Sequence, residues 1–282
     1  TTIDGMHFIL VPFLLANEDQ WKNGPEYTFN ASLGMVTHMA VDIGEPMASN
    51  LLVTMKCRPK EPVRLNCRFE NARITKFLPE KFEPEASTPP SSATFSDFGF
   101  GNASFEILFK DDGIESYTFE NDSRLMGDYL VNMYRLIANH LSAGIKFRKD
   151  VSSRLRKVEN STLGECSVNY NISRTKLEEQ ASNKDYQLSK NNIRVVAKEI
   201  FKFGFLFDIS SIGRIFITSA NFTSESINKV EIYNMKDKKI GTVLDHIRVS
   251  LVSVNPVKAE LTEVANPMIV GTTLKKDNHY LL

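Results

Sequence analysis

The sequence is short of cysteine, of net charge and of long apolar runs, and each shortage excludes a class of protein. Three cysteines leave at least one without a partner in the chain. Lys plus Arg and Asp plus Glu both total 34, so no overall field attracts nucleic acid or an anionic membrane. No stretch has the roughly 18–20 apolar residues that a membrane span needs. The chain begins at Thr1 rather than at methionine, which is typical of a processed protein.

Motifs for catalysis or metal binding are also missing. The histidines lie far apart and form no His-x-x-x-His pair, which argues against a metal site; they are His7, His38, His140, His246 and His279. There is no Gly-x-Ser-x-Gly elbow and no Gly-rich phosphate loop followed by lysine. Residues 97–99 read Asp-Phe-Gly and residues 99–101 read Gly-Phe-Gly, but neither has the flanking motifs of a kinase or a dinucleotide site. An enzyme is therefore the least favoured class.

The content of the chain predicts one folded domain that is mainly β. A hydrophobic share of 42% can fill a sizeable core, and no low-complexity block or long linker divides the chain. We expect a single domain over residues 1–282, in which 255–282 could form a C-terminal appendage. Residues 124–141 carry apolar side chains at spacings of three and four, including Met126, Leu130 and Ile137, and this predicts one long helix. The remainder alternates with period two, so the fold class is α+β, an antiparallel barrel-like sheet wrapped around one central helix.

The clearest predicted hairpin joins residues 51–57 to residues 62–69 through the turn Arg58-Pro59-Lys60-Glu61. With a turn centred near residue 60, Cys57 lies opposite residue 62 or 63. Cys57 and Cys67 would then be roughly 13 Å or more apart at ~3.3 Å per residue, beyond the reach of a disulfide. We therefore expect all three cysteines to be free.

Further strands are predicted on both sides of the helix. Residues 26–37 open the sheet, and residues 105–110 and 114–120 form a hairpin around Asp111-Asp112-Gly113. Residues 146–157 are rich in Lys and Arg, and we interpret them as a solvated connector rather than an anion site. The strands predicted after it are residues 162–172, 186–196, 199–208, 213–222, 226–235 and 240–254.

One predicted strand carries four aromatic rings on one face. In EIFKFGFLFDI, residues 199–209, the rings at every second position belong to Phe201, Phe203, Phe205 and Phe207. This wall is either ordinary core or one side of a site for a long conjugated molecule or an acyl chain, whose affinity comes from aromatic contact and area.

Six Asn-x-Ser/Thr sequons indicate passage through the secretory pathway. They are Asn30, Asn102, Asn121, Asn160, Asn171 and Asn221. We expect most of them to be on the surface and glycosylated. Asn171 should face outward if its neighbours Val168 and Tyr170 face inward.

Three segments together resemble the N-terminal domain of the vitellogenin family of large lipid-transfer proteins. Residues 109–141 are similar to its strand, Gly turn, strand and apolar helix. TLGECSVNYNIS, residues 162–173, resembles its Gly-Glu-Cys followed by Tyr, and YQLSKNNIR, residues 186–194, resembles its Leu-Thr-Lys strand. The resemblance covers nearly the whole chain and implies a barrel-like antiparallel sheet around a central helix.

The departures from the family pattern concern cysteine and the receptor-binding strand. The family resemblance implies a disulfide partner for Cys166, but no cysteine follows Cys166 here. It also implies receptor recognition by the Leu-Thr-Lys strand, which Leu188, Ser189 and Lys190 match, whereas a second basic residue of that strand is Asn192. A free thiolate can attack a linear tetrapyrrole, so Cys166 is the first candidate for ligand attachment and Cys57, flanked by Lys56 and Arg58, is the second.

We expect a secreted, non-enzymatic carrier of hydrophobic small molecules in an extracellular, haemolymph-like fluid. The ligands implied are lipids such as phospholipid, or pigments such as a biliverdin-like bilin and a xanthophyll carotenoid, with no metal, no nucleic acid and no membrane span. Such a carrier could form a homodimer. The alternative is a processed fragment of a yolk precursor that serves as a nutrient store and a receptor-binding module. In either case a thiol that stays free in a secreted protein could instead be a small buried hydrophobe.

Overall fold

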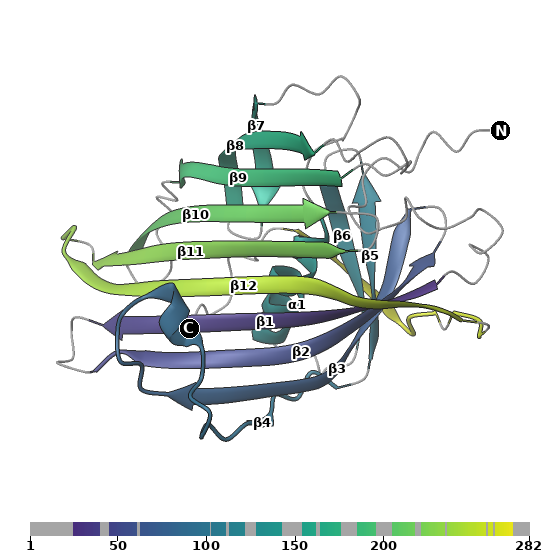
Figure 1. Ribbon diagram of the computed structural model, residues 1–282, viewed down its shortest axis with the longest axis horizontal. Helices are drawn as coiled ribbons and strands as arrows, with labels where there is room; N and C mark the ends of the chain where they lie inside the picture. Colours follow the sequence, from purple (N-terminus) through teal and green to yellow (C-terminus); the bar gives the residue numbers. More distant parts are fainter. Residues whose placement is uncertain are drawn as a thin grey trace.

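The described part of the protein is an antiparallel sheet with one short α-helix against one face (Figure 1). The structure, a computed structural model, describes residues 25–39, 45–60, 63–101, 103–110, 113–121, 128–142, 154–161, 164–175, 185–195, 205–217, 221–234, 236–257, 259–261 and 263–272. For many residues in the strands between 154 and 217 it describes the backbone alone. No helix in these ranges has the length and hydropathy that a bilayer span requires.

The 13 described strands belong to a single sheet. In chain order they are β1 (Pro25–Met39), β2 (Met47–Lys60), β3 (Arg64–Phe77), β4 (Ser96–Asp97), β5 (Ser104–Lys110), β6 (Gly113–Glu120), β7 (Arg154–Ser161), β8 (Gly164–Thr175), β9 (Asp185–Val195), β10 (Phe205–Ile217), β11 (Phe222–Asn234), β12 (Lys239–Pro256) and β13 (Pro267–Gly271). The spatial order is β13-β6-β5-β3-β2-β1-β12-β11-β10-β9-β8-β7, and β4 pairs with β3 off this path.

The predicted barrel-like closure does not occur among the described residues. The two terminal strands of the sheet are β13 and β7. β13 pairs with β6 and β7 pairs with β8, and they stand at opposite ends of the strand order. Closure depends on the tilt and stagger summed over every strand, which no local pattern reports. Figure 1 shows the outcome: β7 to β12, β1 and β2 form a twisted layer, and β5 and β6 stand steeply across one end of it.

The helix is shorter than the sequence predicted. α1 runs from Asp128 to Ala138, and residues 139–141 form a 3₁₀ turn, η4 (Asn139–Leu141). The Ser142 amide donates to the Asn139 carbonyl at 3.1 Å, which tightens this end. The first predicted residues, 124–127, lie outside the described residues. The apolar stripe itself is confirmed, because Met133, Ile137 and Leu141 are buried in the main core.

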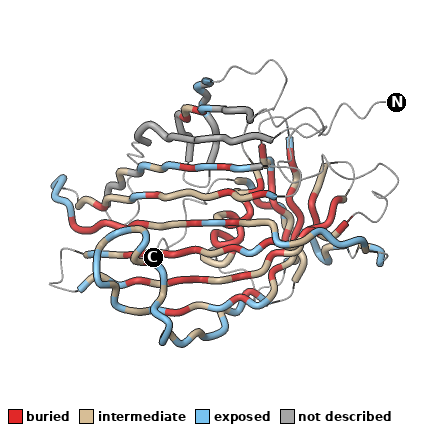
Figure 2. Tube along the Cα trace, in the orientation of Figure 1, coloured by how far each residue is buried: buried red, intermediate tan, exposed pale blue. Residues whose placement is uncertain are grey.

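The core fills the space between α1 and one face of the sheet, which we call the inner face (Figure 2). On β1 the inner face carries the buried side chains of Tyr27, Phe29, Ala31 and Leu33, every second residue as predicted for a half-buried strand. A smaller cluster on the opposite, outer face joins Val36 to Phe82 and Ala86, near the 3₁₀ turn η3 (Pro84–Ser87).

Two strand boundaries differ from the prediction because polar residues were misread as connections. Residues 199–208 and 213–222 were predicted as two strands, but β10 continues through Ser210 and Ser211. Ser210, Ile212 and Arg214 are exposed while Gly213 and Ile215 are buried, so this serine occupies an outward strand position. Likewise, part of the predicted basic connector is the start of β7. Arg154 and Arg156 are exposed at alternate positions, as charged residues often are on an edge strand.

Part of the predicted C-terminal appendage belongs to the same sheet. Arg58 is buried because its guanidinium donates to the carbonyls of Ala259 and Glu260. Beyond that contact, β13 pairs with β6 along its whole length. The single-domain boundary remains a prediction, but residues 259–271 are tied to the sheet at two places.

Candidate functional site

An aromatic cluster lies where α1 faces β3, β5 and β6. Tyr134 of α1 is at its centre, with its ring centroid 4.7 Å from that of Phe69, 4.8 Å from Phe100, 4.9 Å from Phe105 and 5.3 Å from Phe119. Three of these contacts are edge-to-face, the geometry that aromatic quadrupoles favour. The Tyr134 hydroxyl donates to the Phe100 carbonyl at 3.0 Å, and burial raises the pKa of Tyr134 to about 12. The cluster is therefore uncharged and apolar at neutral pH.

A pocket opens at the margin of this cluster. It is small, with a volume of about 20 Å³, which is room for about one water molecule, and its lining consists of Ala103, Ser104, Phe105, Phe119, Glu120, Val131 and Tyr134. Besides the Tyr134 hydroxyl, which is bonded to the Phe100 carbonyl, the polar side chains of the lining are Ser104 and Glu120, and both are partly exposed. Sites for hydrophobic ligands share this apolar wall and polar rim but usually measure about 300–1,000 Å³, so the cluster would have to open to admit a ligand here.

A buried arginine lies on the same helix and was not expected from the sequence. The side chain of Arg135 is 1% exposed, and its Nη1 donates to Asn132 Oδ1 at 3.1 Å, one helical turn earlier. Burial raises the pKa of Tyr117 on β6 well above its ordinary value, and the Arg135 cation acts in the opposite direction. Arg135 lies off the predicted apolar stripe, so no sequence signal identified its burial.

Three of the five histidines are described, namely His38, His140 and His246, and His7 and His279 lie outside the described residues. His140 Nδ1 and Nε2 lie 2.9 Å and 3.2 Å from the hydroxyls of Ser224 and Ser226 on β11, which links η4 to the inner face. His246 Nε2 lies 2.6 Å from Glu225 Oε1. Within the described ranges, no group of three His, Cys, Asp or Glu side chains could hold a metal ion.

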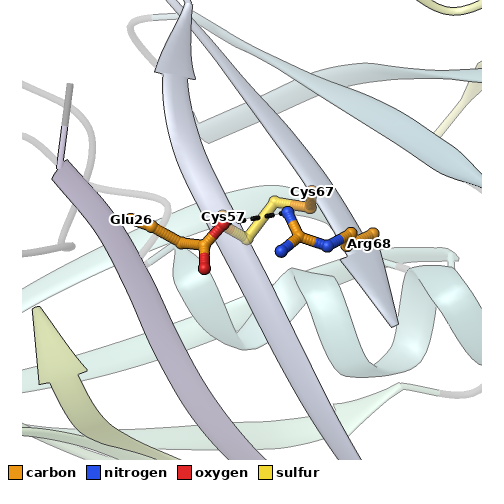
Figure 3. Close-up of a disulfide and its surroundings, with 4 residues drawn as sticks. All are labelled: Glu26, Cys57, Cys67 and Arg68. Carbon is orange, nitrogen blue, oxygen red and sulfur yellow. Dashed lines mark ion pairs between the residues drawn. A yellow bond between two sulfur atoms is a disulfide. The ribbon is translucent and has the colours of Figure 1, made fainter. Parts of the chain in front are cut away.

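The expectation that all cysteines are free is wrong, because Cys57 and Cys67 form a disulfide (Figure 3). Their Cα atoms are 4.1 Å apart and they are direct partners in the β2–β3 register. β2 continues through Pro59 to Lys60, so the hairpin is centred near residue 62 rather than 60. Cys57 is thus not a free nucleophile and cannot form a bond to a ligand while the disulfide is intact.

The disulfide is buried in the main core, and charged side chains lie next to it in sequence on the opposite, outer face of the strands. Arg68 Nη1 lies 2.9 Å from Glu26 Oε2, as Figure 3 shows, and Arg68 Nε lies 2.9 Å from Glu70 Oε1. Lys56 Nζ lies 2.8 Å from Glu70 Oε2. This bond is the main reason why the pKa of Glu70 is lowered, and partial burial acts in the opposite direction. Of the two charges that we expected to activate Cys57, Lys56 is engaged in an ion pair with Glu70 and Arg58 donates to the carbonyls of Ala259 and Glu260.

Several other predicted site residues are described in part or not at all. Phe201 and Phe203 lie outside the described residues, and Phe205 and Phe207 begin β10 with backbone alone described. Cys166 is on β8, opposite Glu159 of β7. On β9, Leu188 pairs with Ile215, Ser189 with Arg214 and Lys190 with Gly213. The aromatic wall and the receptor-binding strand therefore remain predictions.

Four of the six sequons have described, exposed asparagines. They are Asn30, Asn121, Asn171 and Asn221. Asn171 is exposed whereas Val168 and Tyr170 are buried, as the alternation along β8 predicted. Asn102 lies outside the described residues, and only the backbone of Asn160 is described. Glycosylation itself remains a prediction.

Comparison with known proteins identifies the fold and the family. A solved structure reported as lipid–protein interactions in lipovitellin matches with a TM-score of 0.60 and 11% sequence identity, over 90% of this chain and 28% of that chain. The present chain thus spans about a quarter of the length of that protein, and an identity this low shows the fold alone. DynF from the dynemicin biosynthesis pathway of Micromonospora chersina covers 84% of both chains at 9% identity, but its TM-score of 0.20 carries no structural argument. A search of curated proteins returned no match.

The family profile of the vitellogenin N-terminal domain matches residues 21–258, which is most of the chain. The match includes α1, the aromatic cluster and every strand except β13. The chain therefore belongs to the vitellogenin N-terminal domain family.

Proposed function

We propose that this protein is a non-enzymatic carrier of hydrophobic small molecules. The observation that supports the proposal most directly is that the chain belongs to the vitellogenin N-terminal domain family, and the apolar aromatic cluster around Tyr134 is the candidate wall of the site. Once opened, this wall would offer van der Waals contact and area, and Ser104 and Glu120 at its rim would leave a polar end of the ligand near water. Lipids, including phospholipid, are the first class of ligand that fits this chemistry.

Conjugated pigments are the second class of ligand within the same proposal. Aromatic edges and faces suit the flat π-system of a bilin or the polyene of a xanthophyll. The pigment protein dibilinoxanthinin is the solitary domain of this kind to which we compare the chain. If the wall of Phe201, Phe203, Phe205 and Phe207 faces a ligand, it would add a second aromatic surface.

A covalently held bilin would be attached through Cys166. With Cys57 and Cys67 bonded to each other, Cys166 is the remaining cysteine of the 282-residue sequence. Its thiolate would add to an electrophilic carbon of the tetrapyrrole, so that an S–C bond forms, a C=C π bond is lost and a proton from solvent completes the addition. No oxidant or reductant is needed for this step.

We place the carrier outside the cell, as a glycoprotein. The six sequons support this, since four of their asparagines are exposed. We include a homodimer in the proposal, and light scattering on the purified protein tests this oligomeric state.

Organic extraction of the native protein tests the carrier proposal. We expect mass spectrometry of the extract to show a lipid or pigment at a stoichiometry near one or more per chain, and an absorption band in the visible region if the ligand is a pigment. A protein without visible absorption and without extractable lipid would refute the carrier function.

A second candidate is that the chain is a piece of a yolk precursor with storage and receptor-binding roles. The specific observation in its favour is that this chain corresponds to 28% of the lipovitellin chain. Leu188, Ser189 and Lys190 would then be the receptor-binding residues. Sequencing the native transcript distinguishes the two: a reading frame that continues through the remaining lipovitellin domains supports the precursor, and one that stops at Leu282 excludes it.

A further inference from the structure

The inner face of β12 carries one acidic side chain in an apolar series. Its inward positions are Val243, Asp245, Ile247 and Val249, and all except Asp245 are buried hydrophobic residues. Across the ladders, Asp245 lies opposite Asn228 of β11 and Met35 of β1. Two apolar clusters therefore meet at this carboxylate: the main core, which contains Ile247, and a smaller cluster that contains Val243.

Asp245 is only partly satisfied by its neighbours. Asn228 Nδ2 donates to Asp245 Oδ1, and Asn228 is 6% exposed. Among the described residues no donor is bonded to Asp245 Oδ2. Asp245 retains an intermediate exposure, yet burial raises its pKa to about 6. A carboxylate that solvent reaches but that apolar atoms surround is costly when ionised, and it gains free energy from any donor that arrives.

The smaller cluster offers a surface for an apolar chain beside this carboxylate. Ile232, Ile240 and Val243 are buried in it, and Met35, Met39 and Val230 pack against them with partial exposure. Methionine side chains adapt to ligands of different shape because they are unbranched and polarisable.

We propose that Asp245 binds the polar end of an amphiphilic ligand that carries a hydrogen-bond-donating head, a hydroxyl or an ammonium group, on an apolar chain. The inference rests on the carrier function proposed above and specifies its ligand class. The head group donates to Asp245 Oδ2 while Asn228 holds Oδ1, and the chain lies against Met35, Met39 and Val243. A head that ends in a bare carboxylate or phosphate is disfavoured, because it would face the Asp245 carboxylate without a bridging cation, whereas a phospholipid whose terminal group is a hydroxyl or an ammonium fits the proposal.

The charged groups next to Asp245 leave this preference intact. His246 follows it in the chain and extends to the outer face, where it meets Glu225 at 2.6 Å. On the inner face the partners across the ladder, Asn228 and Met35, are uncharged. Among the described residues at this part of the inner face, the Asp245 carboxylate is therefore the charged group next to a bound ligand.

The test compares three probes with the same C16 chain: hexadecanol, hexadecylamine and palmitate. Binding of each radiolabelled probe to the purified full chain is measured at pH 7.5 by gel-filtration partitioning. The variant Asp245→Asn keeps the shape of the side chain and its bond with Asn228, and Glu225→Gln makes the same chemical change on the outer face as the matched control. Asp245→Leu is a second variant that also removes the acceptor for hexadecanol, and thermal melting verifies that each protein is folded.

We expect the unmodified protein to bind hexadecylamine at least about tenfold more tightly than palmitate, with hexadecanol between them. Asp245→Asn should reduce the amine-to-palmitate ratio to about threefold or less, and Glu225→Gln should leave it unchanged. Probes that all bind, with a ratio that Asp245→Asn does not alter, would refute the role of Asp245 and leave the carrier function standing. A protein that binds none of the three probes would refute the carrier function and this inference together.

Discussion

The ionisation of Asp245 affects folding as well as binding. Its pKa is raised from the model-compound value near 4 to about 6, because burial disfavours the charged form more than the Asn228 hydrogen bond and the charge of His246 favour it. The folded state therefore binds the proton more tightly than the unfolded chain does. The resulting stabilisation is present below about pH 4 and is lost as the pH rises through about 6.

The variant Asp245→Asn should consequently be more stable than the unmodified protein at pH 7.5 and about equally stable at pH 4. We expect a gain in the free energy of unfolding on the order of 1–2 kcal/mol at pH 7.5, less than the full pKa shift implies because solvent screens a partly exposed group. Urea unfolding at both pH values measures it. An equal gain at pH 4 and pH 7.5 would contradict the assignment of the shifted pKa to this residue.

The thiol count provides a second test at the scale of single residues. Because Cys57 and Cys67 are bonded, a thiol reagent added to the protein denatured without reductant should label one cysteine, and peptide mapping should identify it as Cys166. A prior reduction step is the control and should bring the number to three. Labelling of three cysteines without reductant would show that the disulfide is absent.

Loss of that disulfide should destabilise the hairpin moderately. The two cysteines are 10 residues apart, and closing so short a loop corresponds to about 2–3 kcal/mol in the chain-entropy model. The double variant Cys57→Ala/Cys67→Ala should therefore unfold at lower urea concentration while remaining folded in buffer. A double variant with an unchanged midpoint would mean that the cross-link contributes nothing beyond the ladder.

At the scale of elements, α1 should be most sensitive on the side that faces the sheet. Ile137 is 1% exposed within the main core, whereas Leu130 is half-buried at its margin. Ile137→Asp places an unpaired charge in the core and should cost several kcal/mol, a large part of a total stability of roughly 5–15 kcal/mol. Leu130→Asp should cost clearly less, because its carboxylate can reach water. Thermal melting of both variants tests the order, and a reversed order would mean that the helix is rotated.

The 3₁₀ turn η3 depends on the absence of a side chain at one position of β1. A Cβ added to Gly34 would lie 2.0 Å from Ser87 Oγ, closer than any non-bonded contact. Ser87 is also held by the Asn50 amide, which donates to its carbonyl at 3.0 Å. Gly34→Ala should displace η3 from the outer face and cost about 1–3 kcal/mol through overpacking.

Limited proteolysis followed by mass spectrometry measures this displacement. Cleavage between residues 78 and 95 should be faster in Gly34→Ala than in the unmodified protein. Gly271→Ala is the matched control, because nothing lies within 4 Å of its added Cβ. Equal cleavage rates in all three proteins would show that η3 accommodates the methyl group.

For the whole molecule, the exposed sequons predict a glycoprotein. Asn30 and Asn171 are on the outer face, and Asn121 and Asn221 are exposed where strands end. Enzymatic removal of N-glycans from the native protein should lower its mass without altering ligand binding, since none of these asparagines lines the pocket. An unchanged mass would argue against the secretory route.

The sequence by itself determined which residues face the core and the general class of the fold. Alternation along β1 and the spacing of Met133, Ile137 and Leu141 in α1 and η4 are local properties, because the side-chain period of a strand or helix follows from backbone geometry. The family resemblance then implied the order of strands and helix. Within the described residues the alternation along β1, the burial of Met133, Ile137 and Leu141 and the mainly β antiparallel fold were confirmed, whereas the barrel closure and the length of the helix were not.

Only the tertiary structure decided the strand register, the open sheet and the environment of single polar groups. Moving the predicted hairpin centre from residue 60 to 62 shifts the partner of Cys57 to Cys67, but an even shift keeps the same side chains facing inward, so the alternation cannot detect it. Openness of the sheet depends on twist and stagger accumulated over many strands. Arg135 and Asp245 look like ordinary polar residues in the sequence. Their burial comes from elements far along the chain, whose positions are set by the fold as a whole and not by the neighbouring residues.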